Sequence, residues 1–139
     1  MRHALTLAKR AAQAGDVPVG AVVVSGSGEL PGEGWNQRAR DGDPSANAAV
    51  VAIRAAAARL GTWRLAGCTL VVTMEPCPMC AGAAMLARVD RVVLGAWDPK
   101  LGACGSVWDV LRDRRATHRA EVVGGVLEQE CGDVVRRFF

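Results

Sequence analysis

Glu75-Pro76-Cys77-Pro78-Met79-Cys80 joins two segments of different pattern, and this junction decides the fold. The apolar, β-branched run at residues 68–73 predicts a buried strand, and residues from about 76 to 87 predict a helix that begins near a proline. A second β-branched run follows at residues 91–95. Strand, helix and strand with short connections predict a parallel pair with a right-handed crossover.

The N-terminal half predicts elements on either side of a hairpin. Apolar residues spaced three and four apart predict a helix over residues 1–14. Strands are expected at residues 17–24 and 29–35, around a glycine-serine turn. Residues 36–43 predict a loop, and Pro44 with Ser45 predicts the start of an alanine-rich helix.

The C-terminal part predicts shorter elements. A glycine-rich loop at 96–105 precedes a helix-like segment at 107–111, a strand at 121–124 and a final helix toward Phe139. We therefore expect an α/β fold of three layers, an α/β/α sandwich whose central mixed sheet has five strands. Residues 1–139 are expected to form a single domain.

Composition narrows the class of protein. Half of the residues are hydrophobic, enough for a core, and no run reaches the roughly 18 apolar residues of a membrane span. We expect a cytoplasmic protein with no membrane partner. Five cysteines, an odd number, do not suggest a secreted disulfide framework. A formal net charge of +3 permits a polyanionic partner without demonstrating one.

Cys77 and Cys80 have the spacing of metal ligands, each near the start of a helix. Nucleobase deaminases carry His-x-Glu followed at a distance by Pro-Cys-x-x-Cys, in which the histidine and both cysteines bind zinc and the glutamate moves protons. In this chain Asn47 stands at the histidine position and Ala49 at the glutamate position. The two helices expected to begin near Asn47 and Cys77 would both direct the positive end of their helix dipole at the metal site. This would favour the thiolate form of the cysteines over the thiol form.

Further segments match one family along nearly the whole chain. They are Met1-Arg2-His3-Ala4-Leu5-Thr6-Leu7-Ala8, Val17-Pro18-Val19-Gly20-Ala21-Val22, Gly32-Glu33-Gly34-Trp35-Asn36, Asp43-Pro44, Glu75-Pro76-Cys77, Cys80-Ala81-Gly82-Ala83, Gly95-Ala96, Gly105-Ser106 and Phe138-Phe139. On these residues the chain resembles the bacterial tRNA adenosine deaminases, which have the cytidine deaminase-like fold. The resemblance implies a homodimer that binds a tRNA anticodon stem-loop.

The resemblance also implies the reaction. In that family a zinc ion, Zn²⁺, activates a water molecule that attacks C6 of the wobble adenosine, giving inosine and ammonia. Cys77 and Cys80 match the two thiolate ligands of one zinc ion per subunit. Asn47 and Ala49 mark the positions of the missing histidine ligand and the missing glutamate.

Four residues match the substrate side of the family's site. Asn36 matches an asparagine expected to hydrogen-bond the extruded base, and Pro18 and Val19 match its pocket wall. Asp98 matches a loop acid near the substrate's backbone. The alternative for Asn36 and Asp98 is that each is an ordinary turn residue.

A positioned general acid and base contributes roughly 10² to 10⁴ in rate, so alanine at position 49 predicts very low activity. Two explanations stay open: deliberate substitution of an active enzyme, and a natural pseudo-deaminase that acts as an RNA-binding or scaffold subunit. A deaminase of free bases such as guanine is a third interpretation.

The remaining features have structural alternatives. Cys77 and Cys80 alone would also suit a redox pair or half of a structural zinc site, and Asn47 a helix cap. Cys68, Cys104 and Cys131 are most simply buried apolar residues. Six arginines would suit either a solvated surface or contacts to RNA phosphates: Arg112, Arg114, Arg115, Arg119, Arg136 and Arg137.

Overall fold

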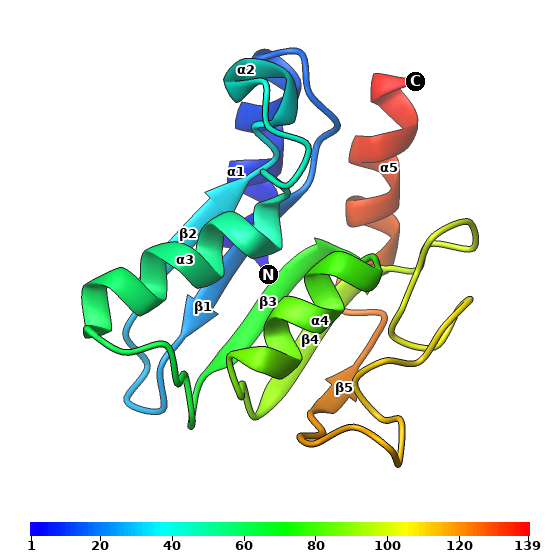
Figure 1. Cartoon of the computed structure of the whole chain (residues 1–139). Coiled ribbons are helices and arrows are strands. Elements are labelled where there is room, and N and C mark those ends of the chain that lie inside the picture. Colours follow the sequence, from blue (N-terminus) through cyan, green and yellow to red (C-terminus); the bar gives the residue numbers. More distant parts are fainter.

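In the computed structural model, which describes residues 1–139, five strands form one mixed sheet in the order β2-β1-β3-β4-β5 (Figure 1). The strands are β1 (Gly20–Val24), β2 (Gly32–Trp35), β3 (Thr69–Met74), β4 (Arg91–Ala96) and β5 (Glu121–Val123). β1 pairs antiparallel with β2 and β3, whereas β4 pairs parallel with β3 and β5. The predicted hairpin and the predicted parallel crossover are confirmed.

Helices cover both faces of the sheet. They are α1 (Arg2–Gln13), α2 (Arg38–Asp41), α3 (Ala48–Leu60), α4 (Pro78–Leu86) and α5 (Glu128–Phe138). α3 and α4 lie side by side on one face, and α1 and α5 lie on the other (Figure 1). The three-layer sandwich expected from the sequence is therefore confirmed.

Glycines in β2 allow α3 to lie unusually close to the sheet. A Cβ atom on Gly34 would lie 2.4 Å from the Ala48 carbonyl oxygen, and one on Gly32 would lie 2.2 Å from the Ala52 carbonyl oxygen. The side chain of Ala52 is fully buried between the two elements. The backbone of β2 thus fixes the position of the α3 N-terminus.

This packing gives a testable stability difference. Gly34→Ala should lower the free energy of unfolding by about 2 kcal/mol or more, because the new methyl group meets backbone atoms that cannot move aside. The matched control is Gly82→Ala in α4, where a Cβ atom meets nothing within 4 Å. Alanine there should raise stability by roughly 0.5–1 kcal/mol. Urea unfolding checks both values, and a Gly34→Ala protein as stable as the parent would contradict the packing argument.

The helix predicted to begin at Pro44 and Ser45 begins at Ala48 instead. Asp43 Oδ1 accepts hydrogen bonds from the Ser45 backbone N–H at 2.8 Å and from its hydroxyl at 2.7 Å. These contacts form a local turn that competes with the helix. Asn47 is consequently the extended N-cap residue, and its side chain makes no capping hydrogen bond.

Two other local predictions are wrong. Residues 36–43, expected to be a loop, contain the single-turn helix α2. Residues 107–111, expected to be helical, are not, because the Gly102 carbonyl accepts the backbone N–H of both Val107 and Trp108. An isolated bridge between Cys104 and Asp109 completes this compact turn.

None of the five helices is long and apolar enough to span a bilayer.

Candidate metal and substrate site

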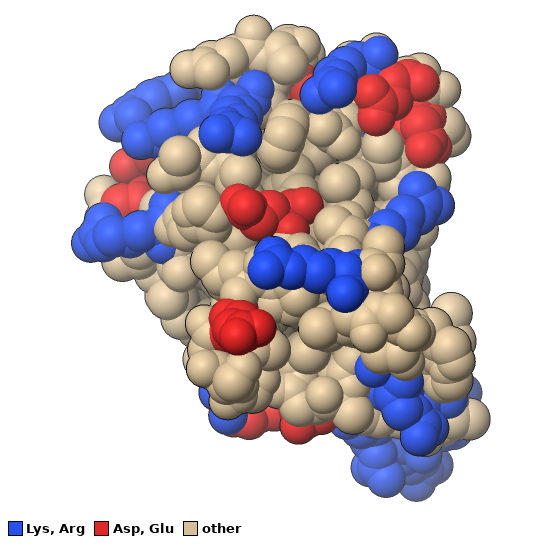
Figure 2. All heavy atoms as spheres, turned by 90° about the vertical axis from the view of Figure 1, so that its left-hand side faces the viewer, with Lys and Arg blue, Asp and Glu red and all other residues tan.

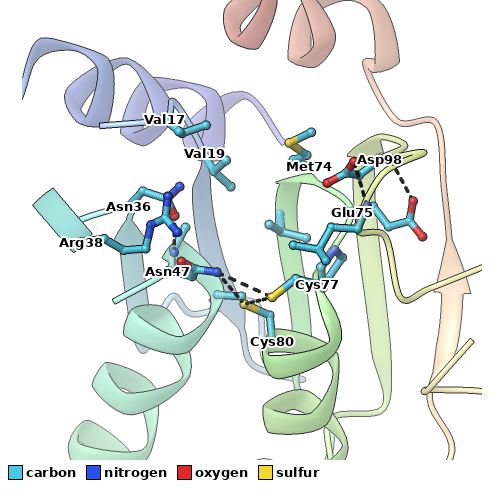
Figure 3. Close-up of a pocket in the computed structure, with 15 residues that line it drawn as sticks. Val17, Val19, Asn36, Arg38, Asn47, Met74, Glu75, Cys77, Cys80 and Asp98 are labelled. Carbon is cyan, nitrogen blue, oxygen red and sulfur yellow. Dashed lines mark hydrogen bonds between the residues drawn. The ribbon is translucent and has the colours of Figure 1, made fainter. Parts of the chain in front are cut away.

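Asn47, Cys77 and Cys80 meet at the N-terminal ends of α3 and α4 (Figure 3). The two sulfur atoms are 3.6 Å apart. Asn47 Nδ2 lies 3.7 Å from the Cys77 Sγ atom and 3.5 Å from the Cys80 Sγ atom. Three side chains from two separate helix starts therefore converge on one point, as the positions of the deaminase pattern require.

The spacing of these three atoms fits a tetrahedral zinc ion. Zinc binds sulfur at about 2.3 Å and nitrogen or oxygen at about 2.1 Å, which places its ligand atoms roughly 3.5–3.8 Å apart. The Asn47 Oδ1 atom is buried and has no hydrogen-bond partner. Exchanging the amide O and N atoms, which is a half-turn of the side-chain amide, directs this oxygen at both sulfurs. The set then consists of two thiolates and one neutral oxygen.

The electrostatics of the pair favour one thiolate. The pKa of Cys77 falls to about 5, chiefly because the Cys80 thiol donates to its sulfur, with further donation from backbone N–H groups of Cys80 and Met79 and from Asn47. The pKa of Cys80 rises, because its thiol is the donor in that bond and because it is buried. The two shifts together favour a thiolate at Cys77 and a thiol at Cys80.

A cavity of about 170 Å³ opens beside the cysteine pair. Ala49 lines it, and its methyl group occupies the position where the deaminase pattern has glutamate. Val19 and Asp98 also line the cavity, as the resemblance led us to expect. Pro18 does not, since its side chain is fully buried, and Val17 forms that part of the wall instead.

Asn36 lies at the cavity wall and is 6% exposed. Its Oδ1 atom accepts the Ala48 backbone N–H at 2.8 Å, which satisfies one of the free donors at the start of α3. Its Nδ2 atom has no hydrogen-bond partner in the structure and is available to a ligand. Asn36 therefore both fixes the helix start and offers a donor.

The sequence analysis missed several residues that shape this site. Asp16 is buried and accepts the backbone N–H of Val17 at 2.8 Å and of Ala39 at 2.9 Å, so it ties α2 to the cavity wall. Arg38 lines the cavity and forms no ion pair. Glu75 is buried, and it lines the same cavity as Cys77 and Cys80. Their residue types carry no periodic signal, so only the assembled fold shows their positions.

Comparison with known proteins assigns the family. Residues 1–96 match the model of the cytidine and deoxycytidylate deaminase zinc-binding region. The chain belongs to this deaminase family. Among the relatives of this chain, the tRNA-specific adenosine deaminase of Bacillus subtilis (strain 168) is 49% identical over 139 residues, which is all of this chain and 86% of the relative. The enzyme of the same name from Haemophilus influenzae is 45% identical over the whole chain and 80% of its own length.

Another relative contains a similar sequence as part of a much longer chain. The tRNA(Ile)-lysidine synthase of Deinococcus deserti is 51% identical over 139 residues, but these make up only 26% of that protein. The same sequence pattern thus occurs both as a protein of similar length and as part of a much longer one.

Solved structures give the same family assignment for this chain. A chain from a study of A-to-I editing by tRNA:A34 deaminases at the wobble position of transfer RNA has a TM-score of 0.92 and 37% identity, over 96% of each chain. Guanine deaminase from Bacillus subtilis has a TM-score of 0.67 and 34% identity, over 99% of this chain and 91% of that one. The cytidine deaminase-like fold and the resemblance to bacterial tRNA adenosine deaminases are confirmed.

Proposed function

We propose that this protein is of the tRNA adenosine deaminase type and takes the wobble adenosine of an anticodon stem-loop into the cavity, but hydrolyses it very slowly or not at all. The substrate part of the proposal is supported by relatives of that name and by a solved tRNA:A34 deaminase of closely similar shape. The impairment is supported by one observation: the Ala49 methyl group lines the cavity beside the cysteine pair.

In such a site, each of these residues would have a separate role. Cys77 and Cys80, with Asn47 as a weak third ligand, would hold zinc, which supplies activation of a water molecule when bound. Asn36 Nδ2 would donate to the base. Ala49 has no group that holds or moves a proton. Proton transfer would therefore be roughly 10²- to 10⁴-fold slower than with a glutamate at this position.

A second function follows from the same two positions. Because both the general acid/base and the histidine ligand are absent, we also consider a pseudo-deaminase that binds RNA or supports a partner without catalysis. Deamination of free guanine is less well supported, because the guanine deaminases of Nitrosomonas europaea and Bacillus subtilis have TM-scores of 0.84 and 0.67 at 25% and 34% identity, below the 0.92 at 37% identity of the tRNA deaminase.

The proposal includes an assembly and a place of action. We propose one domain over residues 1–139, one zinc ion per subunit and a homodimer. Exposed apolar side chains on α4 support a subunit interface, since Leu86 is 63% and Met79 40% exposed. A tRNA substrate would place the protein in the cytoplasm.

Phosphate contacts would come from particular arginines. On the side of the molecule that carries β2 and α3, Figure 2 shows basic side chains in separate groups with acidic ones between them. Arg112, Arg115 and Arg136 pair with nearby aspartates. Of the six arginines named in the sequence analysis, the remaining three are exposed and form no ion pair: Arg114, Arg119 and Arg137. Together with Arg38, which lines the cavity and forms no ion pair, these three are the contacts to RNA phosphates that we propose.

Salt dependence tests the proposal. Binding of an anticodon stem-loop, followed by fluorescence anisotropy at roughly 50 and 200 mM salt, should weaken as salt rises, because phosphate contacts release counterions. Replacing Arg114 and Arg119 by alanine should lower the slope of log K against log salt by about 0.7–0.9 for each phosphate that is no longer neutralised. Arg115→Ala is the control, because Asp113 already pairs with Arg115. Binding that ignores salt, or no binding, would contradict the RNA assignment.

A further inference from the structure

Glu75 is a buried acid that follows β3 and precedes the cysteine loop. Its side chain is 4% exposed, and it forms no ion pair. Oε1 accepts the Asp98 backbone N–H at 2.9 Å and the Ser106 hydroxyl at 2.5 Å. Oε2 accepts the backbone N–H of Cys104 at 3.0 Å and of Ser106 at 3.1 Å. Four donors, all from residues 98–106, therefore satisfy one carboxylate.

The donors explain why an acid occupies this position. Both oxygens face N–H groups, so each must act as an acceptor. An amide of the same shape would place an NH₂ group against at least one backbone N–H in either orientation. A buried carboxylate without donors would be costly, and here backbone donors take the place of a cation.

The same loop forms one wall of the cavity. Asp98 and Leu101 line it, and the Asp98 Oδ1 atom accepts the backbone N–H of Lys100 at 3.0 Å and of Leu101 at 3.3 Å. Glu75 therefore holds Asp98, the first residue of a turn that contributes Asp98 and Leu101 to the cavity wall (Figure 3).

Two further contacts tie this wall to the cysteine side. The Ala103 backbone N–H donates to the Pro76 carbonyl at 2.8 Å, one residue before Cys77. A Cβ atom on Gly102 would lie 2.3 Å from the Glu75 carboxyl group, so only glycine fits there. The loop is thus closely fitted around the Glu75 side chain.

We propose that Glu75 is a positioning residue that sets the distance between the cysteine pair and the cavity wall carrying Asp98 and Leu101. It acts on ligand binding through that wall and does not hold the metal. The inference rests on the proposed function only for the identity of the ligand, because the positioning role concerns the loop itself.

The test is Glu75→Gln in the full chain, loaded with one equivalent of zinc. Amide exchange at Asp98, Cys104 and Ser106 should become faster by about fivefold or more, and the stem-loop Kd should rise by a similar factor. Zinc content should not change. Ser106→Ala, which removes one donor side chain and keeps the carboxylate, should produce a smaller change in the same direction and serves if Glu75→Gln does not fold.

Two control variants separate positioning from general destabilisation. Asp90→Asn makes the same chemical change on a carboxylate outside the cavity lining, whose Oδ1 atom accepts the Gly67 backbone N–H at 3.0 Å, and it should leave Kd unchanged. Val89→Ala shortens a fully buried core side chain outside the cavity lining, so it should lower Tm and keep Kd.

Each result decides the inference. Unchanged exchange and Kd in Glu75→Gln would overturn it, as would a loss of affinity that follows a loss of zinc, or an equal loss in Val89→Ala. If the parent protein does not bind the stem-loop, the proposed function fails. The exchange rates of the three loop amides then decide the positioning role by themselves.

Discussion

The double substitution Asn47→His with Ala49→Glu is expected to produce a protein that releases inosine from an anticodon stem-loop. We expect a rate at least about 10² to 10⁴ above that of the present chain, because a carboxylate at position 49 would supply both general acid and general base. The new carboxylate would face the cavity, since Ala49 already lines the wall beside the two cysteines. Single-turnover assays of inosine formation measure the difference.

The two single variants separate the causes. Ala49→Glu alone should gain little, because the metal site still has a weak third ligand, and Asn47→His alone should bind zinc without turning over. A double variant that binds zinc and RNA but forms no inosine would count against the deaminase assignment. Consumption of free guanine while RNA is ignored would show that the substrate is wrong.

Zinc affinity should respond strongly to position 47. Asn47→His is expected to bind zinc at least about a hundredfold more tightly, since an imidazole nitrogen replaces a neutral amide oxygen and loss of outer contacts alone costs 10- to 100-fold. Competition with a chromophoric chelator gives the constants. The rise in Tm on adding zinc should also be larger in the variant.

Cys77→Ser in each background is the matched control for this measurement. It removes one of two sulfurs that lie 3.6 Å apart and should abolish tight binding in both. Equal zinc affinity of the parent and Asn47→His proteins would mean that position 47 does not face the metal.

The order of elements and the three layers were predictable because they depend on patterns spread over many residues. The apolar run before Cys77 and the alternation of strand and helix predicted the β3-α4-β4 unit, which the structure confirms. The convergence of Asn47, Cys77 and Cys80 also agrees with the family pattern. An error in the predicted bounds of one element does not change these predictions, because several side chains support each of them.

Local competition and long-range contacts were not predictable. The Asp43–Ser45 turn delays α3 until Ala48, and no periodicity shows it. Val17 lines the cavity whereas the adjacent Pro18 is fully buried, and only the folded path of the irregular segment before β1 decides which of the two lines it. Glu75 contacts residues 98–106, more than twenty positions away, and no spacing rule connects them.

The glycine contacts between β2 and α3 have a consequence for how silent enzymes arise. Because backbone atoms hold the α3 N-terminus, the place of residues 47 and 49 does not depend on which side chains they carry. Replacements at positions 47 and 49 can therefore change the chemistry of the site while the surrounding fold stays the same. Overall sequence identity and TM-score therefore do not distinguish active from inactive relatives. The residues at positions 47 and 49 do.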